Sequence, residues 1–352
     1  MARPKINPLD GMTWLTKRVA DQPRGLAKDF AVAFGVSRMA ATTFIRERVE
    51  AGFFIREGSD TRPTYFPGPR RFLRHRYPMP NIDESQIWLK DFFPYLQPLP
   101  QNLEDICHYG FTEMLNNAND HSEGNEVVAT AYKDEKIIFL AIEDNGVGIF
   151  EKITHALQLP DKRFALLELG KGKFTTDQSN HSGEGIFFTS RMFDRFVIRA
   201  NGLTFKHDDQ APLDILSEDD IVLGQDDFGG RGTSVCMIVA ENSQRTSREV
   251  FDRFTLDDEE LNFDKTIVPV KLARVGSENL ISRSQAKRLL NRLDRFKHIE
   301  LDFSGIDMIG QAFADEVFRV FKNNHPDISL KPVNTSDEVR KMIGRVNSAM
   351  KR

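Results

Sequence analysis

The sequence lacks the features that mark secreted, membrane-spanning and disulfide-stapled proteins. It has only two cysteines in 352 residues, Cys107 and Cys236, which are too few for a disulfide framework or a zinc site. Both lie in apolar surroundings, so we expect packed thiols in a reducing cytoplasm. No apolar run approaches the length of about 18 residues that suggests a transmembrane helix, and the first residues contain no apolar signal segment. We therefore expect neither a membrane span nor export.

The sequence also lacks the G-x-x-x-x-G-K-[ST] pattern of the common phosphate-binding loop. Its composition, 40% hydrophobic and 28% charged, is typical of a soluble globular protein. The length predicts two or three domains. Any nucleotide site in this chain must therefore be built from other residues.

Charge is distributed unevenly along the chain. Residues 1–76 contain 15 Lys and Arg against 7 Asp and Glu, although the whole chain has a net charge of −4. A basic head on an acidic body indicates that the head alone meets a polyanion, unless the charge is simply a solvated surface.

The basic head has the pattern of three short helices followed by a hairpin. Helices are predicted over 12–22, 25–35 and 38–52, with Gly35 ending the second and Ser37 capping the third. Residues 53–66 predict two short strands around a Gly-Ser-Asp turn.

This order resembles a winged helix-turn-helix, and the A-x-x-x-G-V-S turn is similar to that of bacterial regulators. The resemblance implies DNA binding by residues 12–67, with the third helix in the major groove and the wing on phosphate. The residues implied on the third helix are Ser37, Arg38, Thr42, Thr43 and Arg46, and those on the wing are Arg56 and Arg62. Protein contact by the same fold remains an alternative.

Residues 68–100 are predicted to connect this first domain, 1–67, to the next. The stretch PGPRRFLRHRYPMP is rich in proline and arginine and predicts a stiff linker rather than a helix. A mixed helical segment broken by Pro94 follows it.

Residues 101–245 contain four motifs that point to a nucleotide site. A helix from about Asn102 to His121 has a buried apolar stripe and places Glu113, Asn117 and Asp120 on one face. Two β-branched runs then predict a hairpin that ends in Asp144-Asn145-Gly146-Val147-Gly148, where glycines let the backbone approach a ligand. A Gly-, Ser- and Thr-rich loop leads into HSGEGI, where a helix N-terminus suits an anion.

These motifs, in this order, resemble the GHKL (Bergerat-fold) ATPases, which include gyrase, MutL, histidine kinases and anti-sigma serine kinases. The resemblance implies ATP and Mg²⁺ as cofactors. It makes Glu113 the general base, Asn117 the Mg²⁺ ligand and Asp144 the adenine acceptor. Gly146 and Gly148 shape the adenine pocket. The implied lid is 171–182, the phosphate-loop glycines are Gly183 and Gly185, and the last adenine-side contact is Thr233.

The use of the ATP is left open between hydrolysis and phosphate transfer to a protein. A histidine kinase requires a phospho-acceptor histidine on a helical hairpin before the site, and His75 and His108 lack that setting. The segment SGEGIFFTSRMFD is similar to the anti-sigma serine kinases. A serine/threonine kinase acting on a separate partner therefore remains an alternative.

An acidic linker over 246–264 leads to a third unit, 265–352, in which strands and helices alternate. This alternation predicts a mostly parallel sheet. LDFSGIDMIGQAFADEVF resembles the central strand and helix of STAS domains, here of the DUF4325 type, which are partners of anti-sigma kinases. The positions of the phosphorylated serine motif hold Gly310, Gln311, Ala312 and Phe313, so the acceptor hydroxyl is missing, and Ser304 is predicted to be a turn residue.

The sequence thus predicts an α+β multidomain protein with an N-terminal winged helix, a central Bergerat-fold α/β sandwich and a C-terminal STAS-like α/β domain. The expected function is a cytoplasmic ATP-binding switch that acts on DNA, with a protein partner or self-association through the STAS-like domain. A nucleotide-gated scaffold that does not bind DNA remains a further alternative.

Overall fold

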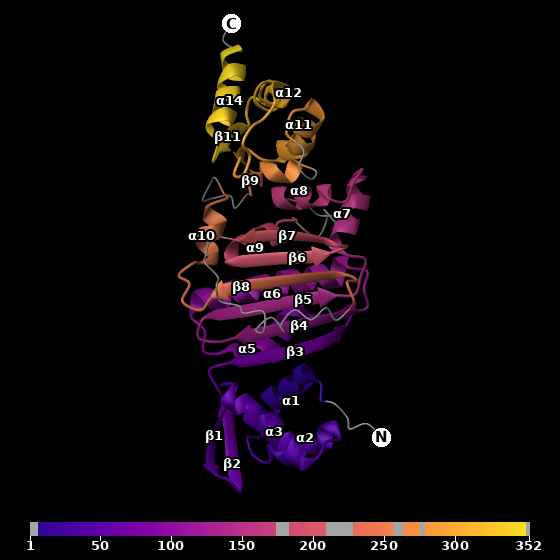
Figure 1. Ribbon diagram of the computed structural model, residues 1–352, viewed down its shortest axis with the longest axis vertical. Helices are drawn as coiled ribbons and strands as arrows, with labels where there is room; N and C mark the ends of the chain where they lie inside the picture. The colour runs from indigo at the N-terminus through magenta and orange to yellow at the C-terminus, as the bar shows by residue number, and fades with distance from the viewer. Residues whose placement is uncertain (1–5, 174–182, 209–227, 256–262, 275–278, 350–352) are drawn as a thin grey trace. The chain divides into compact units, whose positions relative to one another are not determined.

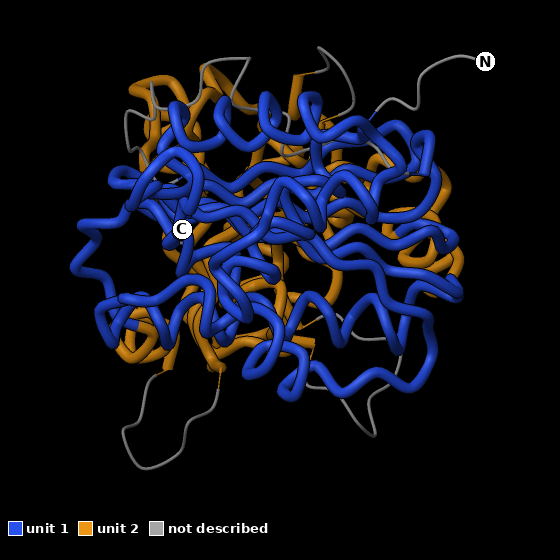
Figure 2. Tube along the Cα trace, turned by 90° about the horizontal axis from the view of Figure 1, so that it is seen from below, with its two compact units in different colours: residues 1–148, 189–246 blue, residues 149–188, 247–352 orange. Residues whose placement is uncertain are grey.

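The computed structural model describes residues 6–173, 183–208, 228–255, 263–274 and 279–349 (Figure 1). Its contacts divide the chain into two compact units, one formed by 1–148 and 189–246 and the other by 149–188 and 247–352 (Figure 2). The predicted nucleotide domain, 101–245, is therefore divided between the two units, because residues 149–188 belong to the unit that contains the C-terminal residues. The division falls inside helix α9 (Gly185–Met192).

The first unit begins with three helices and a hairpin. These elements are α1 (Pro8–Asp21), α2 (Leu26–Phe34), α3 (Arg38–Glu50), β1 (Phe54–Ser59) and β2 (Arg62–Pro67). Ser37 accepts a hydrogen bond from the backbone N–H of Ala40 and so caps α3, while Gly35 ends α2 at a φ of +63°. The predicted helices, cap and hairpin of this segment are confirmed.

Aromatic side chains form the core of this head. Phe30 stacks on Phe34 and on Phe44, with ring centroids 4.4 and 5.0 Å apart, and Trp14 meets Phe30 edge-on at 5.4 Å. Such pairs add about 0.5–1.5 kcal/mol each beyond the burial of area. The core therefore fixes the angle at which α3 crosses the other two helices.

The segment predicted to be a stiff linker is instead a strand. β3 (Arg71–Pro78) pairs antiparallel with β4 along its whole length. Its side chains alternate across an edge strand, where Phe72 is buried in the core of the head and the arginines are half-buried or exposed. The Thr16 hydroxyl of α1 donates a hydrogen bond of 2.8 Å to the Phe72 carbonyl. Proline restricts only the ends of this segment, so the sequence between them is free to extend.

The rest of the first unit is an antiparallel sheet in the order β3-β4-β5-β8-β6-β7. Helix α6 contacts β4, β5 and β8, and its buried stripe runs from Leu103 to Ala118. The elements are α4 (Glu84–Ile87), η1 (Trp88–Phe92), α5 (Phe93–Leu96), α6 (Gln101–His121), β4 (Glu126–Lys133), β5 (Ile137–Asp144), β6 (Arg195–Ala200), β7 (Leu203–Asp208) and β8 (Thr233–Ala240). The predicted β4–β5 hairpin is confirmed.

The second unit contains a parallel sheet in the order β11-β10-β9, as the alternation of strands and helices predicts. Its elements are α7 (Ile149–Leu157), α8 (Phe164–Lys171), α10 (Ser247–Asp252), β9 (Lys265–Pro269), η3 (Val270–Ala273), α11 (Arg283–Leu290), η4 (Leu293–Arg295), β10 (His298–Asp302), α12 (Gln311–Asp315), η5 (Glu316–Phe321), α13 (Lys322–Asn324), β11 (Ser329–Val333) and α14 (Asp337–Ala349). Helix α8 packs against β9 and η3, which explains why 149–188 group with the C-terminal residues.

Candidate functional site

The turn that follows β5 holds a buried carboxylate. Asp144 Oδ1 accepts hydrogen bonds from the backbone N–H of Gly146 at 2.9 Å and of Thr233 at 3.3 Å. Asp144 and Thr233 are only 5% and 9% exposed. The structure therefore brings together three of the predicted adenine-side residues, from the end of β5 and the start of β8.

Burial decides the protonation of this carboxylate. It raises the pKa of Asp144 to about 6, because the charged form loses hydration, while the hydrogen bonds from Gly146 and Thr233 oppose the shift. At pH 7 the group is mainly ionised and accepts hydrogen bonds. Such a carboxylate is suited to hold a donor that arrives from a ligand, such as an exocyclic amine.

Gly146 is required by a close approach of two backbone segments. A Cβ atom at this position would lie 2.0 Å from the carbonyl oxygen of Ser122. The same carbonyl accepts a hydrogen bond of 2.9 Å from the N–H of Val147. Since Ser122 is the C-cap of α6, the turn after β5 is tied to the end of that helix.

Gly148 is also fixed by its surroundings. Its φ is +85°, and a Cβ would lie 2.4 Å from Oδ1 of Asn201. The Asn201 amide donates a hydrogen bond of 2.9 Å to the carbonyl of Val147. Thus the loop between β6 and β7 supports the predicted pocket glycine, a role that the sequence pattern did not indicate.

Gly232 is a further residue of this site that sequence reasoning missed. Its φ is +81°, and a Cβ would lie 1.8 Å from the carbonyl oxygen of Asp144. The available signal was its place in GGRGT, directly before the predicted Thr233. Without a side chain at 232, the start of β8 lies close enough for the Thr233 N–H to reach Asp144.

Glu113 and Asn117 lie one turn apart on α6, as predicted, and both are half-buried. Asp120 is exposed. Neighbouring Asn119 accepts hydrogen bonds from the N–H groups of Asn81 and Ile82, which positions the chain before α4 on the last turns of the helix. Glu113 and Asn117 thus lie on the same helix whose C-cap, Ser122, is hydrogen-bonded to the turn after Asp144.

The residues predicted to lie on the phosphate side belong to the second unit. Gly183 has a φ of +72°, and Gly185 is the first residue of α9. The predicted lid is corrected at its start, because α8 extends through Lys171 and the buried ammonium of that residue bonds within the second unit. Residues 174–182 of the predicted lid lie outside the described residues.

The protein supplies few possible metal ligands near Asn117. Within the described parts of the chain, no group of three or more His, Cys, Asp or Glu side chains could hold a metal ion. Mg²⁺ commonly takes one or two protein oxygens and completes its shell with phosphate and water. The Asn117 amide oxygen therefore fits Mg²⁺ only when nucleotide phosphates supply further ligands.

The predicted DNA-facing residues of α3 share one surface. Ala41, Phe44 and Ile45 are buried in the head, whereas the predicted contacts are exposed, namely Ser37, Arg38, Thr42, Thr43 and Arg46. On the hairpin, Arg56 pairs with Asp60 at 2.6 Å and Arg62 is exposed. This arrangement leaves the polar face of α3 available to a ligand.

Comparison with protein families identifies the C-terminal part of the chain. Residues 285–340 match DUF4325, described as a STAS-like domain of unknown function. No curated protein matches the chain. No helix in the described ranges is long and apolar enough to cross a membrane.

The STAS-like domain carries no serine at the start of its central helix. Gly310 is the N-cap of α12, followed by Gln311, Ala312 and Phe313. Ser304 donates its hydroxyl to Asp302 Oδ1 at 2.7 Å, and its N–H reaches the same oxygen at 3.0 Å. The prediction that Ser304 is a turn residue is therefore confirmed.

Proposed function

We propose that this chain is an ATP-binding, slowly hydrolysing regulatory switch that couples nucleotide state to DNA binding and transcription control. The observation that carries the proposal is the buried Asp144 carboxylate, held at the end of β5 by backbone N–H groups of Gly146 and Thr233. Glycines at 146 and 232 keep the surrounding backbone close. A nucleobase amine is a fitting donor for an ionised carboxylate in such a place.

In this proposal Asn117 supplies a Mg²⁺ ligand and Glu113 acts as the general base that activates water. Both lie on α6, and the carbonyl of its C-cap residue Ser122 accepts a hydrogen bond from the N–H of Val147 in the Asp144 turn. The phosphate-side roles of Gly183 and Gly185 rest on the sequence motif alone.

Backbone hydrogen bonds between neighbouring strands, together with one side-chain hydrogen bond, support the proposed coupling between the Asp144 turn and the head. β5 pairs with β4, β4 pairs with β3, and the Phe72 carbonyl of β3 accepts the Thr16 hydroxyl of α1. A change at the end of β5 thus has a rigid path to the helices of the head. Coupling further requires that ATP binds two conformations with different affinity.

DNA is the proposed ligand of the head, because α3 presents arginines and hydroxyl side chains on an exposed face of a basic segment. A head that contacts protein instead would make the chain a nucleotide-gated scaffold. The two functions differ in whether the head binds DNA at all.

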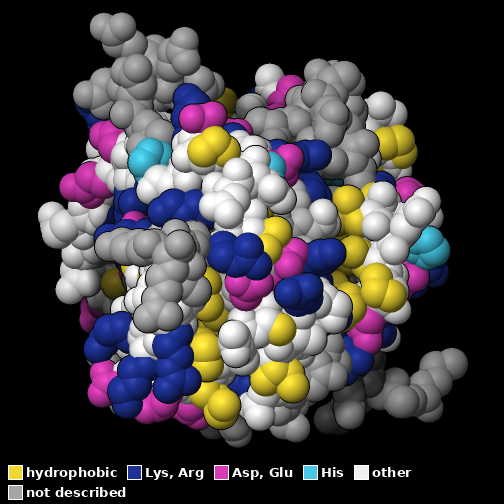
Figure 3. Space-filling model, turned by 90° about the horizontal axis from the view of Figure 1, so that it is seen from above, with side chains coloured by type: hydrophobic (Ala, Val, Ile, Leu, Met, Phe, Trp, Pro, Cys, Tyr) yellow, Lys and Arg dark blue, Asp and Glu magenta, His cyan; other side chains and the backbone are white. Residues whose placement is uncertain are grey.

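The STAS-like domain is proposed to contact a protein partner or a second copy. The face drawn in Figure 3 carries Lys and Arg mixed with Asp and Glu, with hydrophobic side chains between them. Ile281 and Met308, beside the bridge of Leu280 to Ile309, are 55% and 52% exposed. Apolar side chains on a surface of mixed charge are typical of protein contacts.

ATP turnover and phosphate transfer separate the switch from a protein kinase. Radiolabelled ATP should yield free phosphate with the wild-type chain, whereas label on a protein partner would support the kinase. The Glu113→Ala variant should bind ATP without turning it over. A mobility-shift assay with nonspecific DNA at low salt, with and without ATP, tests the head, and the absence of any shift would exclude the DNA switch.

A further inference from the structure

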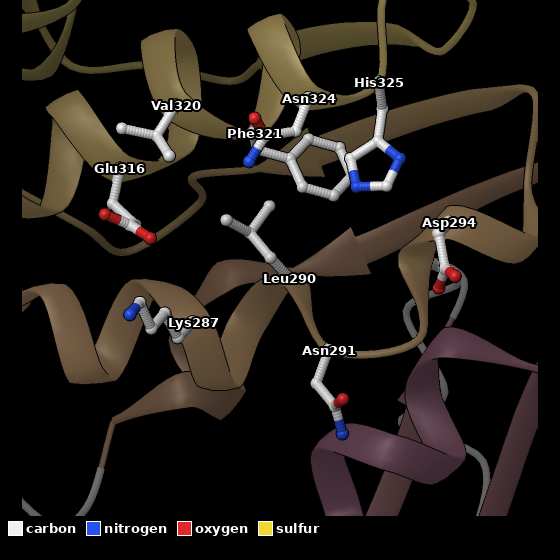
Figure 4. Close-up of a pocket in the computed structure, with 9 residues that line it drawn as sticks. All are labelled: Lys287, Leu290, Asn291, Asp294, Glu316, Val320, Phe321, Asn324 and His325. Carbon is white, nitrogen blue, oxygen red and sulfur yellow. The ribbon is translucent and has the colours of Figure 1, made fainter.

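A groove on the STAS-like domain lies between α11 and the wide helical turn η5. Its volume is about 220 Å³, which equals the space of roughly seven waters and is smaller than a drug-sized pocket. The lining residues are Lys287, Leu290, Asn291, Asp294, Glu316, Val320, Phe321, Asn324 and His325 (Figure 4). A ligand for this groove must therefore be small.

Glu316 is the unusual residue of the groove. Only 9% of the residue is exposed, but among the described residues its carboxylate oxygens are not among the buried polar atoms that lack a partner, and its charge interacts with Arg319. The carboxylate is therefore accessible from the groove, while the rest of the side chain is packed. Figure 4 shows the Glu316 side chain extending from η5 toward α11, so the carboxylate faces the groove.

Lys287 faces Glu316 from the opposite side of the groove (Figure 4). Lys287 is exposed, and among the described residues it forms no ion pair with Glu316. One end of the groove therefore presents a carboxylate and an ammonium that are separated by a gap. A ligand with an amine beside a carboxylate has the matching pair of charges.

The floor of the groove is apolar and its other end is acidic. Leu290 of α11 and Phe321 of η5 lie between the Lys287–Glu316 end and Asp294 (Figure 4). His325 packs on Phe321 with ring centroids 4.6 Å apart. An aliphatic chain would cover this floor, and a cation at the end of that chain would meet Asp294.

The backbone of η5 explains how these residues come together. Glu316–Phe321 form a π-helical turn inside the helix that α12 begins. Its i→i+5 hydrogen bonds widen the turn by one residue, so Val320 and Phe321 both fall on the face of Glu316. Such turns are rare and frequently occur at functional sites.

We propose that this groove binds a free basic amino acid of the lysine, ornithine and arginine class. Glu316 accepts the α-ammonium, Lys287 binds the α-carboxylate, and Asp294 pairs with the cation at the end of the side chain. The aliphatic stem lies over Leu290 and Phe321. With histidine neutral, the lining side chains carry one positive and two negative charges, and the net +1 of a basic amino acid balances them. This assignment is independent of ATP and DNA binding.

The test is calorimetric titration of the full chain with L-lysine at physiological ionic strength. Three analogues each lack one recognised group: norleucine the distal cation, 6-aminohexanoate the α-ammonium, and cadaverine the carboxylate. L-lysine should bind in the millimolar range or tighter, and each analogue at least about tenfold more weakly. Absence of binding at about 10 mM L-lysine, or equal binding of cadaverine, would overturn the proposal.

Two variants locate the site. Glu316→Gln and Asp294→Asn should each weaken L-lysine binding by about tenfold or more, while the exposed Asp327→Asn, outside the groove, should leave it unchanged. Glu316→Gln should leave the melting temperature of the free chain nearly unchanged, because glutamine keeps the shape of a side chain whose carboxylate oxygens are accessible from the groove. A lower melting temperature with unchanged lysine affinity would show a purely structural Glu316. Unchanged affinity in Asp294→Asn, which alters an exposed residue, would equally contradict the site.

Discussion

The Lys171 ammonium lies 2.6 Å from Glu168 Oε1 in the interior of the second unit, where both side chains are 2% exposed. Lys171 also donates to the carbonyls of Arg288 and Asn291, at 3.1 and 2.8 Å, and Arg292 pairs with the second oxygen of Glu168 at 3.4 Å. This network joins α8 to the end of α11. Helix α8 is thereby part of the C-terminal unit, although the sequence assigns it to the nucleotide domain.

Replacement of Lys171 by methionine should therefore destabilise the second unit strongly. The change leaves the Glu168 carboxylate buried with a single, longer contact to Arg292, and a broken buried pair costs about 3–5 kcal/mol. Thermal unfolding followed by circular dichroism measures the effect. The matched control is Lys341→Met, which breaks the exposed pair with Glu338 and should change the free energy of unfolding by less than about 1 kcal/mol. Equal effects of the two substitutions would contradict this account.

Gly232→Ala should disrupt the Asp144 turn. The new methyl would lie 1.8 Å from the Asp144 carbonyl oxygen in a backbone with a φ of +81°, so we expect a loss of about 3 kcal/mol together with loss of ATP binding. Gly202→Ala is the control, because its φ is +74° but no atom lies within 4 Å of the added Cβ. The free energy of unfolding of Gly202→Ala should fall by only about 1 kcal/mol. Chemical denaturation gives the free energy of unfolding of both variants. If Gly232→Ala were as stable as Gly202→Ala, the predicted clash with the Asp144 carbonyl would be wrong.

Asp144 should make stability and nucleotide binding depend on pH in opposite directions. Its pKa is raised from 3.8 to about 6 by burial, so the folded state holds the proton more tightly than the unfolded chain. The stabilising effect of that proton is fully present below pH 4 and is lost as pH rises through 6. Between about pH 4 and pH 6, the free energy of unfolding of the wild type should therefore fall by up to about 3 kcal/mol relative to that of Asp144→Asn.

ATP affinity should rise over the same interval, because the ionised carboxylate accepts the proposed amine. Titrations at pH 5 and pH 7, with the wild type and with Asp144→Asn, measure this change. The variant should show a flatter pH profile of affinity. An identical profile in both proteins would remove Asp144 from the proposed contact.

The double substitution Arg38→Ala and Arg46→Ala should weaken DNA binding by about tenfold or more and reduce its dependence on salt. Each lost phosphate contact lowers the slope of log affinity against log salt by about 0.9, so a change of nearly 2 is expected if both arginines contact phosphate. Fluorescence anisotropy at several salt concentrations gives the slope. Arg340→Ala, at an exposed position of α14, should leave both quantities unchanged. If the slope of log affinity against log salt were the same in the double variant as in the wild type, neither Arg38 nor Arg46 would contact DNA phosphate.

Local signals in the sequence were sufficient for most helices and strands. Ser37 and Gly35 mark the ends of α3 and α2, and the alternation after residue 265 predicts the parallel sheet. These features depend on hydrogen bonds and side-chain periods within a few residues, so they can be inferred without tertiary contacts. The same holds for Asp144 and Gly146, which are close in the chain and bonded to each other.

Long-range packing decided what the local pattern could not show. Residues 71–78 form a strand because β4 supplies hydrogen-bond partners and α1 covers Phe72. Gly232 matters because β8 brings it against β5, and Glu316 faces a groove because a π-helical turn meets α11. The sequence by itself determined most of the helices and strands and which residues carry reactive groups. The tertiary structure alone decided which of these groups lie together, because their contacts join residues that are far apart in the chain.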